Sequence, residues 1–327
     1  MQLQSNNLAP HPWDVASVSD MCVDLVVRGN VRPEFHQVEQ IVGDYSLELG
    51  GSANIFASQL AKLGARTGVL GYVAADMFGE FALQALEQIG ADVTRVKKLS
   101  SLKTGIGIHL TEKHDRAILP YPGSIDATHA EDLDDTLLHS CRHWHHASYF
   151  LLRNLRSSWP DWMQKCRKMG LTTSLDTNWD PDKRWDGVAD LLPYINVFLP
   201  NEAEVLSLTG ETDAWKAARL LASYGPLIVV KRGEKGAIAV KGNQTWQING
   251  SECQDSPLTI VDTTGAGDNF DAGFIHAWLL GYDIEFSLRL GHRCALGSLS
   301  SPGGIHGQLQ EFVGPKIVDT VTAKDGR

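Results

Sequence analysis

The chain has 327 residues, of which 43% are hydrophobic and 21% charged, a balance that is ordinary for a globular protein of one or two domains. Its 29 basic and 39 acidic residues give a net charge of −10, and no Lys/Arg-rich run interrupts this acidic balance. We therefore expect neither nucleic acid nor an anionic membrane surface as the main partner.

Two further observations bear on location. No apolar run approaches the ~20 residues that a membrane span needs, and the first residues, MQLQSNNLAPHPWD, lack the basic-then-apolar layout of a signal peptide. The cysteines are odd in number and scattered, without a CxxC pair, which indicates reduced thiols: Cys22, Cys141, Cys166, Cys253 and Cys294. The sequence thus predicts a cytoplasmic protein.

The first predicted elements follow a polar segment at residues 1–12, which contains two prolines and which we expect to be a loose tail. Val15–Val18 is predicted to be a strand that leads toward Asp24. An aspartate just past a strand can cap a loop, or its carboxylate can accept two hydrogen bonds from a vicinal diol. Asp20 is the less favoured candidate for such a contact.

Paired glycines, Gly50 and Gly51, open a helix that is predicted to end near Gly64. Glycines at such an entrance let a substrate approach the backbone closely, and a tight turn with an N-cap is the structural alternative. Further strands and a helix are predicted after it: strands at 69–73, 105–110 and 116–119, and a helix over 79–90 closed by its terminal glycine.

Four metal-ligand residue types alternate in the middle of the chain, at His139, Cys141, His143 and His145. On one strand they would share a face, but their spacing of about 6–7 Å is too wide to close a tetrahedron around a single ion. The pattern therefore favours a buried or partner-facing strand over a metal site.

Three β-rich runs are predicted to be strands that end in polar residues: 172–175, 197–200 and 227–230. Asp176 and Asn178 follow the first, and a turn with Asx capping is a structural explanation for them. Asn201 and Glu204 follow the second, where ordinary N-cap and first-turn preferences would suffice. Lys231 follows the third and opens a loop that contains Gly233 and Gly236.

The most informative stretch is VDTTGAGDNFDAGFIHAWLLG, residues 261–281. Residues 258–261 are predicted to be a strand, followed by a turn of small residues and a helix. Such a helix start aims free backbone N–H groups and the positive end of the helix dipole at one point, which suits a phosphate. Asp268 could cap this helix, which spacing alone favours, or accept a proton from a hydroxyl that attacks the phosphate.

The segment DTTGAGD, followed by Ala272-Gly273-Phe274, resembles the C-terminal signature of the ribokinase/PfkB family of carbohydrate kinases. The resemblance implies that Asp268 is the catalytic base and that residues 265–267, which are Gly265, Ala266 and Gly267, form the anion hole. It also implies that Asp24 binds two sugar hydroxyls and that Gly50 and Gly51 belong to the sugar site. The family's substrate-binding Asn falls where this chain has Ile55, so Asn54 is the candidate in its place.

The same resemblance implies a nucleotide site for ATP. Lys231, Gly233 and Gly236 would line it, Asn201 would lie near the phosphates, and Thr264 would contribute from the signature. Glu204 would hold Mg²⁺ through water, as magnesium usually binds beside nucleotide phosphates. Asp262 could hold a monovalent cation such as K⁺, with a satisfied turn as the equal alternative.

Strands that alternate with helices over most of the chain predict a doubly wound, mainly parallel α/β sandwich. The resemblance makes this a single ribokinase-like domain over residues 14–310, with loose tails at 1–12 and 315–327. It adds a small β-sheet lid from about 28–49 and 103–120, through which two copies could form a homodimer.

The reaction implied is ATP-dependent phosphotransfer to a primary hydroxyl of a sugar, of the ribose, fructose or keto-deoxy sugar acid class. A nucleoside kinase of the same fold and a non-catalytic sugar- or nucleotide-binding regulator are the alternatives. A dinucleotide-dependent dehydrogenase is not supported, because no GxGxxG follows the first strand. A Walker A motif is missing from the sequence as well.

Overall fold

The larger of two β-sheets runs through the centre of the protein, in a computed structural model that describes residues 11–112, 116–253 and 259–312. Its strands, from one edge to the other, are β13 (Gln244–Ile248), β12 (Ala237–Lys241), β11 (Leu227–Lys231), β10 (Val197–Phe198), β9 (Thr172–Leu175), β8 (His143–His146), β1 (Val15–Val18), β4 (Thr67–Ala74) and β5 (Asp92–Leu99).

The strand order has a reversal point beside β1. The chain passes from β1 outward to β4 and β5, and then returns to β8 on the other side of β1. All neighbouring pairs from β11 to β5 are parallel, while β12 and β13 add an antiparallel hairpin at one edge. This is the predicted doubly wound sheet, and in such sheets ligands bind at the carboxyl ends of the strands beside the reversal.

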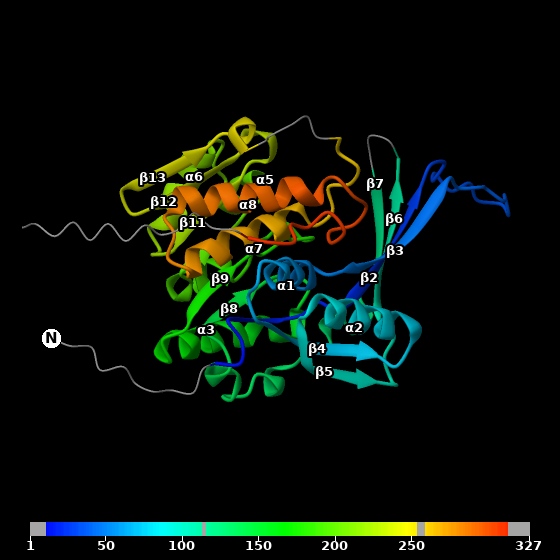
Figure 1. Ribbon diagram of the computed structural model, residues 1–327, viewed down its shortest axis with the longest axis horizontal. Helices are drawn as coiled ribbons and strands as arrows, with labels where there is room; N and C mark the ends of the chain where they lie inside the picture. Colours follow the sequence, from blue (N-terminus) through cyan, green and yellow to red (C-terminus); the bar gives the residue numbers. More distant parts are fainter. Residues whose placement is uncertain (1–10, 113–115, 254–258, 313–327) are drawn as a thin grey trace, which may run out of the picture.

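Helices cover both faces of this sheet (Figure 1). One face carries α1 (Ser52–Lys62), α7 (Ala266–Leu279) and α8 (Ile284–Ser298), with α2 (Met77–Ile89) beside them. The other carries α3 (Trp159–Lys168), α4 (Val188–Leu191), α5 (Glu202–Thr209) and α6 (Ala214–Ala222). Among the described residues, no helix is long and apolar enough to cross a membrane.

Side chains of the central strands alternate between the two helical layers. On β11, Leu227 and Val229 pack in the cluster that includes α7, whereas Ile228 and Val230 pack in the cluster that includes α6. Successive strand residues point to opposite faces, so a strand buried on both sides must be apolar throughout. This explains why β11 is a continuous apolar run with no period-two pattern.

The predicted helix boundaries are close to the observed ones because their capping residues are strong. Asp76 accepts a hydrogen bond from the Gly79 N–H at the start of α2, and Gly90 ends the helix in the left-handed conformation at φ 92°. A left-handed residue after the last turn is the usual glycine termination of a helix.

A second sheet of four strands projects to one side of the main sheet (Figure 1). We call it the lid; its strands, in spatial order, are β3 (Asp44–Gly50), β2 (Cys22–Arg28), β6 (Gly105–Thr111) and β7 (Arg116–Tyr121). The lid begins at Cys22, earlier than the residue 28 expected from the sequence. Asp24 therefore lies within lid strand β2 and not in a loop.

Two further local predictions were wrong. Residues 259–261 form no strand, and Ile260 and Val261 are 54% and 47% exposed, because no described strand lies beside this run to pair with it. Residue 258 lies outside the described residues. Of the four alternating ligand-type residues, His139 belongs to a 3₁₀ turn and Cys141 precedes the strand, so only His143 and His145 share β8.

The lid prediction also included residues 38–41, which form no strand although their hydrophobic residues alternate. Ile41 is 91% exposed, so this segment has no buried face that would fix it against a sheet. The expected tails lie outside the described residues, except for residues 11 and 12.

Candidate active site

Three loops meet where the strand order reverses. Asp20 follows β1, Ser148 follows β8 and Asn178 follows β9. The Ser148 hydroxyl donates to Asp20 at 2.6 Å, and the Ser148 N–H donates to the Asn178 side-chain oxygen at 2.9 Å. Ser148 and Asn178 both have a φ of 54°, so these non-glycine residues are held in the left-handed region. Such backbone strain is common at functional sites, where the surrounding contacts maintain it.

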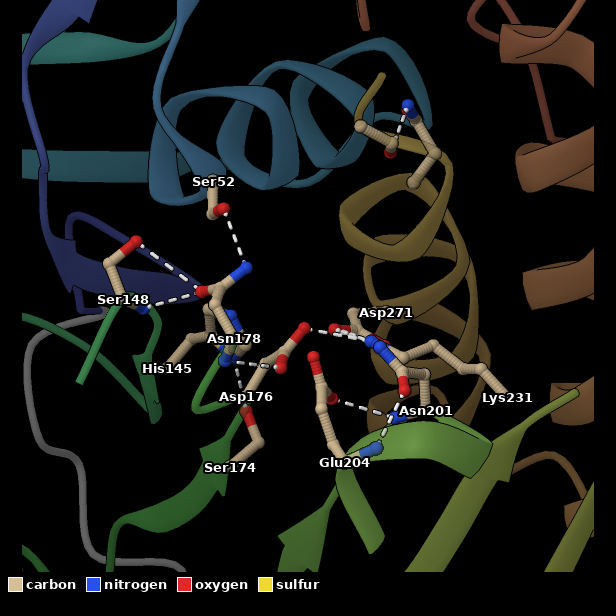
Figure 2. Close-up of polar contacts among 12 residues, drawn as sticks. Ser52, His145, Ser148, Ser174, Asp176, Asn178, Asn201, Glu204, Lys231 and Asp271 are labelled. Atoms are coloured by element: carbon tan, nitrogen blue, oxygen red, sulfur yellow. Dashed lines mark hydrogen bonds and ion pairs between the residues drawn. The ribbon is translucent and has the colours of Figure 1, made fainter. Parts of the chain in front are cut away.

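The N-terminus of α1 is fixed in the same crevice. Asp20 is buried, and its carboxylate accepts hydrogen bonds from the backbone N–H groups of Ser52 and Ala53 at 2.9 and 3.1 Å. The side chain of Asn178 donates to the Ser52 hydroxyl at 2.9 Å (Figure 2). Asp20 is therefore a structural residue that positions Ser52, a role that the sequence analysis did not assign.

The Gly-rich turn places the N-terminus of α7 beside this crevice. Gly265 has a φ of 70°, and a Cβ at this position would lie 2.9 Å from the Ile55 side chain and 3.0 Å from Gly304. Only glycine adopts this left-handed φ without strain and also has no Cβ atom to clash with Ile55 and Gly304. The first backbone N–H groups of a helix have no partner within it, so the start of α7 can bind an anion, as predicted for residues 265–267.

Asp268 lies in the first turn of α7 and is 8% exposed. Burial raises the pKa of its carboxyl to about 7, and the nearby carboxylates of Asp176 and Asp20 raise it as well. Lys231 and the Ser52 side chain lower this pKa. A carboxylate with a pKa near neutrality is well suited to accept a proton at physiological pH.

A buried ion-pair cluster lies beneath the α7 N-terminus. The Lys231 ammonium is 2.7 Å from Asp176 and 3.0 Å from Asp271, and the three side chains face one another in Figure 2. A Cβ on Gly267 would lie 3.3 Å from the Lys231 Nζ atom, so the ammonium is adjacent to the predicted anion hole.

The charged side chains of this cluster change one another's pKa values. Burial alone would lower the pKa of Lys231, but Asp176, Asp271 and Glu204 raise it, so this lysine stays charged. Burial and the Asp176 carboxylate raise the pKa of Asp271 well above its usual range. The sequence analysis missed Asp271, although it lies three residues after Asp268 and so occupies the same side of α7.

Asn201 and Glu204 form the capping box of α5. The Asn201 side chain accepts from the Glu204 N–H at 2.9 Å, and the Glu204 carboxylate accepts from the Asn201 N–H at 2.8 Å. This is the ordinary helix-start role that the sequence left open. Burial raises the pKa of Glu204 to about 7, with a further contribution from Asp176.

The donor set around Glu204 fits a divalent cation that binds through water. Four carboxylates, from Asp176, Glu204, Asp268 and Asp271, gather around one lysine, and the Asp271 Oδ1 atom is buried without a hydrogen-bond partner. A bound cation would offset this excess of negative charge. Among the described residues no group of three or more His, Cys, Asp or Glu side chains is arranged to hold a metal directly.

A cavity of about 820 Å³ opens from this cluster and lies within the size range of small-molecule sites. Its polar end contains Asp176, Asn178, Glu204, Lys231 and Asp268. Its other walls include the predicted nucleotide residues Asn201, Gly233 and Gly236 together with the apolar side chains of Ile260, Phe270, Leu296 and Leu299. The cavity thus joins an anion-binding end to an apolar wall.

Thr264 does not line this cavity, whereas its neighbour Thr263 does. The Thr264 N–H and hydroxyl both donate to Asp262, at 2.9 and 2.8 Å, and the Gly303 N–H donates to the other oxygen of Asp262 at 3.0 Å. These bonds form a satisfied turn at Asp262, and a monovalent cation at this residue stays a prediction.

The predicted sugar residues lie on the lid side of the crevice. The Asp24 carboxylate packs directly over Gly50, where an added Cβ would lie 2.8 Å from it, and its Oδ1 atom is 3.2 Å from His109 Nε2. Gly51 has a φ of 89°, and a Cβ there would lie 2.6 Å from the Asp20 carbonyl. Both glycines are thus required by the close packing of this entrance.

Asn54 is fully buried and bonded within the fold. Its amide nitrogen donates to the Gly50 carbonyl at 2.8 Å, and its oxygen accepts from the Ser19 hydroxyl at 2.5 Å. These bonds fix the Gly50 turn, and a contact between Asn54 and substrate stays a prediction.

The histidines of β8 are bonded to the neighbouring strand. The Ser174 hydroxyl is 2.7 Å from a ring nitrogen of both His143 and His145, and His145 lies beside Asp176 in Figure 2. Burial lowers the pKa of both imidazoles. The prediction of a buried strand is confirmed for these two residues.

Solved structures show the class to which this fold belongs. A ribokinase of Arabidopsis thaliana, complexed with ribose and ATP, aligns with a TM-score of 0.78 over 90% of this chain and 95% of that chain, at 23% identity. An E. coli structure that holds ATP and Mg²⁺ aligns with a TM-score of 0.79 over 90% and 96%, at 22% identity. The protein therefore has the ribokinase-like fold, as predicted.

Sequence comparison narrows the class to a family. The profile of the pfkB family carbohydrate kinases matches residues 14–311. An uncharacterized sugar kinase of Archaeoglobus fulgidus is 29% identical over 257 residues, which cover 76% of this chain and 97% of that protein. The chain belongs to the pfkB family of carbohydrate kinases, which confirms the resemblance seen in DTTGAGD.

Proposed function

We propose that this kinase transfers the terminal phosphoryl group of ATP to a primary hydroxyl of a sugar, with Asp268 as the base. The main support is one juxtaposition: Asp268 is buried in the first turn of α7, beside the backbone N–H groups at the start of that helix, at the end of an 820 Å³ cavity. A base and an anion site lie together there, as a phosphoryl transfer to a hydroxyl requires.

In the proposed reaction the acceptor hydroxyl gives its proton to the Asp268 carboxylate while its oxygen bonds to the transferred phosphorus. The bond from that phosphorus to the bridging oxygen of ATP breaks, and ADP leaves with the bonding electrons. The N–H groups of residues 265–267 and the Lys231 ammonium stabilise the negative charge on the transferred group. The Ser52 side chain acts on the same carboxylate and lowers the pKa of Asp268.

The nucleotide would occupy the cavity with its phosphates at the Lys231 end and its base against the apolar wall. Asn201 would lie near the phosphates, and Glu204 would hold Mg²⁺ through water, where the ion would neutralise charge on the phosphate oxygens. The proposal assigns no K⁺ to Asp262, whose two carboxylate oxygens accept hydrogen bonds from Thr264 and Gly303.

The test is release of ADP from ATP·Mg²⁺ over a panel of ribose, fructose, 2-keto-3-deoxygluconate and nucleosides, with wild type and Asp268→Asn. The matched control is Asp161→Asn, because Asp161 occupies the same first-turn position of α3 but is exposed. Turnover of a sugar that Asp268→Asn loses and Asp161→Asn keeps would support the proposal. Turnover of nucleosides alone would assign a nucleoside kinase, and binding without turnover would assign a regulator.

We also propose a homodimer through the lid. Tyr45, Leu119 and Tyr121 lie on one face of the lid sheet and are 70%, 56% and 47% exposed, a set of apolar side chains that a second lid could cover. Light scattering should give twice the chain mass, and Tyr45→Glu should reduce it to the monomer. A monomeric wild type at micromolar concentration would rule this assembly out.

A further inference from the structure

Two buried carboxylates lie directly opposite each other on the lid. Asp24 of β2 pairs in register with Glu48 of β3, and the two residues are only 9% and 5% exposed. Like charges in directly opposite positions of an antiparallel pair repel each other and destabilise the sheet. Their nearest polar partners are imidazoles, which are His109 for Asp24 at 3.2 Å and His306 for Glu48 at 3.0 Å.

Glycines on neighbouring segments make room for these carboxylates. A Cβ at Gly107 would lie 2.6 Å from an Asp24 oxygen, and a Cβ at Gly303 would lie 2.9 Å from the Glu48 side chain. Each carboxylate is therefore held against a backbone with no side chain, which fixes its position and leaves little freedom to turn away. The orientations of the Asp24 and Glu48 carboxylates are thus set by the packing of the fold.

Glu48 is connected to the proposed phosphoryl-transfer point by two short segments of the chain. Glu48 is two residues before Gly50, and this strand leads through Gly51 to Ser52, whose side chain acts on the Asp268 carboxyl. On the opposite side, Gly303 packs against Glu48, and the adjacent Gly304 packs against Gly265 of the anion hole. Glu48 thus lies between the lid and the loop that supports the anion hole, on the acceptor side of the crevice.

Three described cationic side chains of the lid and the neighbouring loops, those of Arg28, Lys231 and Arg153, are paired with carboxylates. Arg28 is on the same face of β2 as Asp24, but it is four residues, or about 13 Å, further along the strand, and it pairs with Asp44 at 3.2 Å. Lys231 is held by its two aspartates. Arg153 is largely exposed and lies 3.4 Å from Asp126.

We propose that Glu48, together with Asp24, makes the acceptor site selective for an uncharged sugar and against sugars that carry a phosphate or a carboxylate. The inference rests on the proposed function and narrows its substrate class. Hydroxyl groups donate hydrogen bonds to carboxylates, whereas an anionic group would be repelled at close range by both. Of the acceptor classes considered above, ribose and fructose remain and the keto-deoxy sugar acids are excluded.

The test compares matched pairs of acceptors that keep a free primary hydroxyl: fructose with fructose 6-phosphate, and ribose with ribose 1-phosphate. Like charges about 5 Å apart at an effective dielectric constant near 20 repel strongly enough that we expect the neutral member to have a kcat/KM at least about 100-fold higher. An anionic member that wild type uses equally well would refute the inference while leaving the proposed function intact. No turnover of any sugar would instead refute the proposed function.

The role of Glu48 is tested by Glu48→Gln, which keeps the shape and removes the charge. The ratio of kcat/KM for the anionic to the neutral sugar should rise at least about tenfold, because one of two repelling charges is gone. Glu112→Gln, at the outer end of the lid and paired with Arg32, is the matched control and should leave the ratio unchanged. Thermal melting and ATP binding confirm folding, and Asp24→Asn provides a second variant. An unchanged ratio in folded Glu48→Gln and Asp24→Asn proteins would overturn the assignment.

Discussion

Replacement of Asp268 by Asn should stabilise the protein while removing its activity. The Asp268 carboxyl has a pKa of about 7 in the fold against an ordinary value of 3.8, since burial disfavours its ionised form. A raised carboxyl pKa contributes stability that is fully present below pH 3.8 and is lost as pH rises through 7. Above pH 7 the buried Asp268 charge therefore lowers the free energy of unfolding of wild type by its full amount. The Asp268→Asn variant avoids this loss because Asn does not ionise.

The magnitude follows from the difference between the two pKa values. At pH 8 about 3 pKa units at 1.36 kcal/mol each give, as an upper limit, a gain of about 4 kcal/mol in the free energy of unfolding. At pH 5 little more than one unit applies, so the gain is less than about 2 kcal/mol. For a chain of this length, a gain of about 4 kcal/mol raises the melting temperature by about 6 °C. Loss of a general base lowers kcat by roughly 10²- to 10⁴-fold.

The assay is thermal unfolding of the ligand-free protein at pH 5 and pH 8, for wild type, Asp268→Asn and the control Asp161→Asn. The difference between Asp268→Asn and wild type should be positive at pH 8 and clearly smaller at pH 5. A variant that is about 1 kcal/mol less stable than wild type at both pH values would instead have lost a helix cap. That result would refute the electrostatic reasoning and the assignment of Asp268 as base.

Three further outcomes are expected. The kcat/KM for the acceptor should fall about tenfold per pH unit below pH 7, because protonated Asp268 cannot accept a proton; an acid limb with its midpoint below pH 5 would contradict this. In chemical denaturation, Lys231→Met should cost about 3–5 kcal/mol by leaving buried carboxylates unpaired, whereas Lys235→Met, in an exposed pair, should cost less than about 1 kcal/mol. Gly265→Ala should cost about 1–3 kcal/mol and lower kcat, while Gly242→Ala, also left-handed but in open space, should leave kcat unchanged; equal kcat in the two would argue against the tight fit at the anion hole.

The sequence was sufficient to predict the fold because its local signals agree with its global arrangement. The apolar run of β11, the capping residues of α2 and the Gly-rich start of α7 each specify their element with little help from distant residues. The position of Asp268 at the start of α7 could be predicted for the same reason, since a helix start is a local feature.

Contacts between distant segments could not be predicted in this way. Lys231 meets Asp176 and Asp271 across 55 and 40 residues, and only the strand order brings them together. The link from Ser52 to Asn178 spans 126 residues. At residues 259–261 the local composition predicted a strand that does not form, because no described strand lies beside this segment to pair with it.

The lid is assembled from two excursions of the chain, residues 22–50 between β1 and α1 and residues 105–121 after β5, and neither interrupts the order of the main sheet. Asp24, Gly50 and the proposed Glu48 are carried by these excursions, whereas the α7 N-terminus and Lys231 belong to the main body. Substitutions in the excursions can therefore change the proposed acceptor site and leave the proposed phosphoryl-transfer residues as they are. One ancestral kinase could in this way give rise to descendants with different acceptors. Exchange of these two segments between relatives is accordingly the most economical route to engineer a new acceptor preference, provided that the contact of Glu48 with Gly303 is preserved.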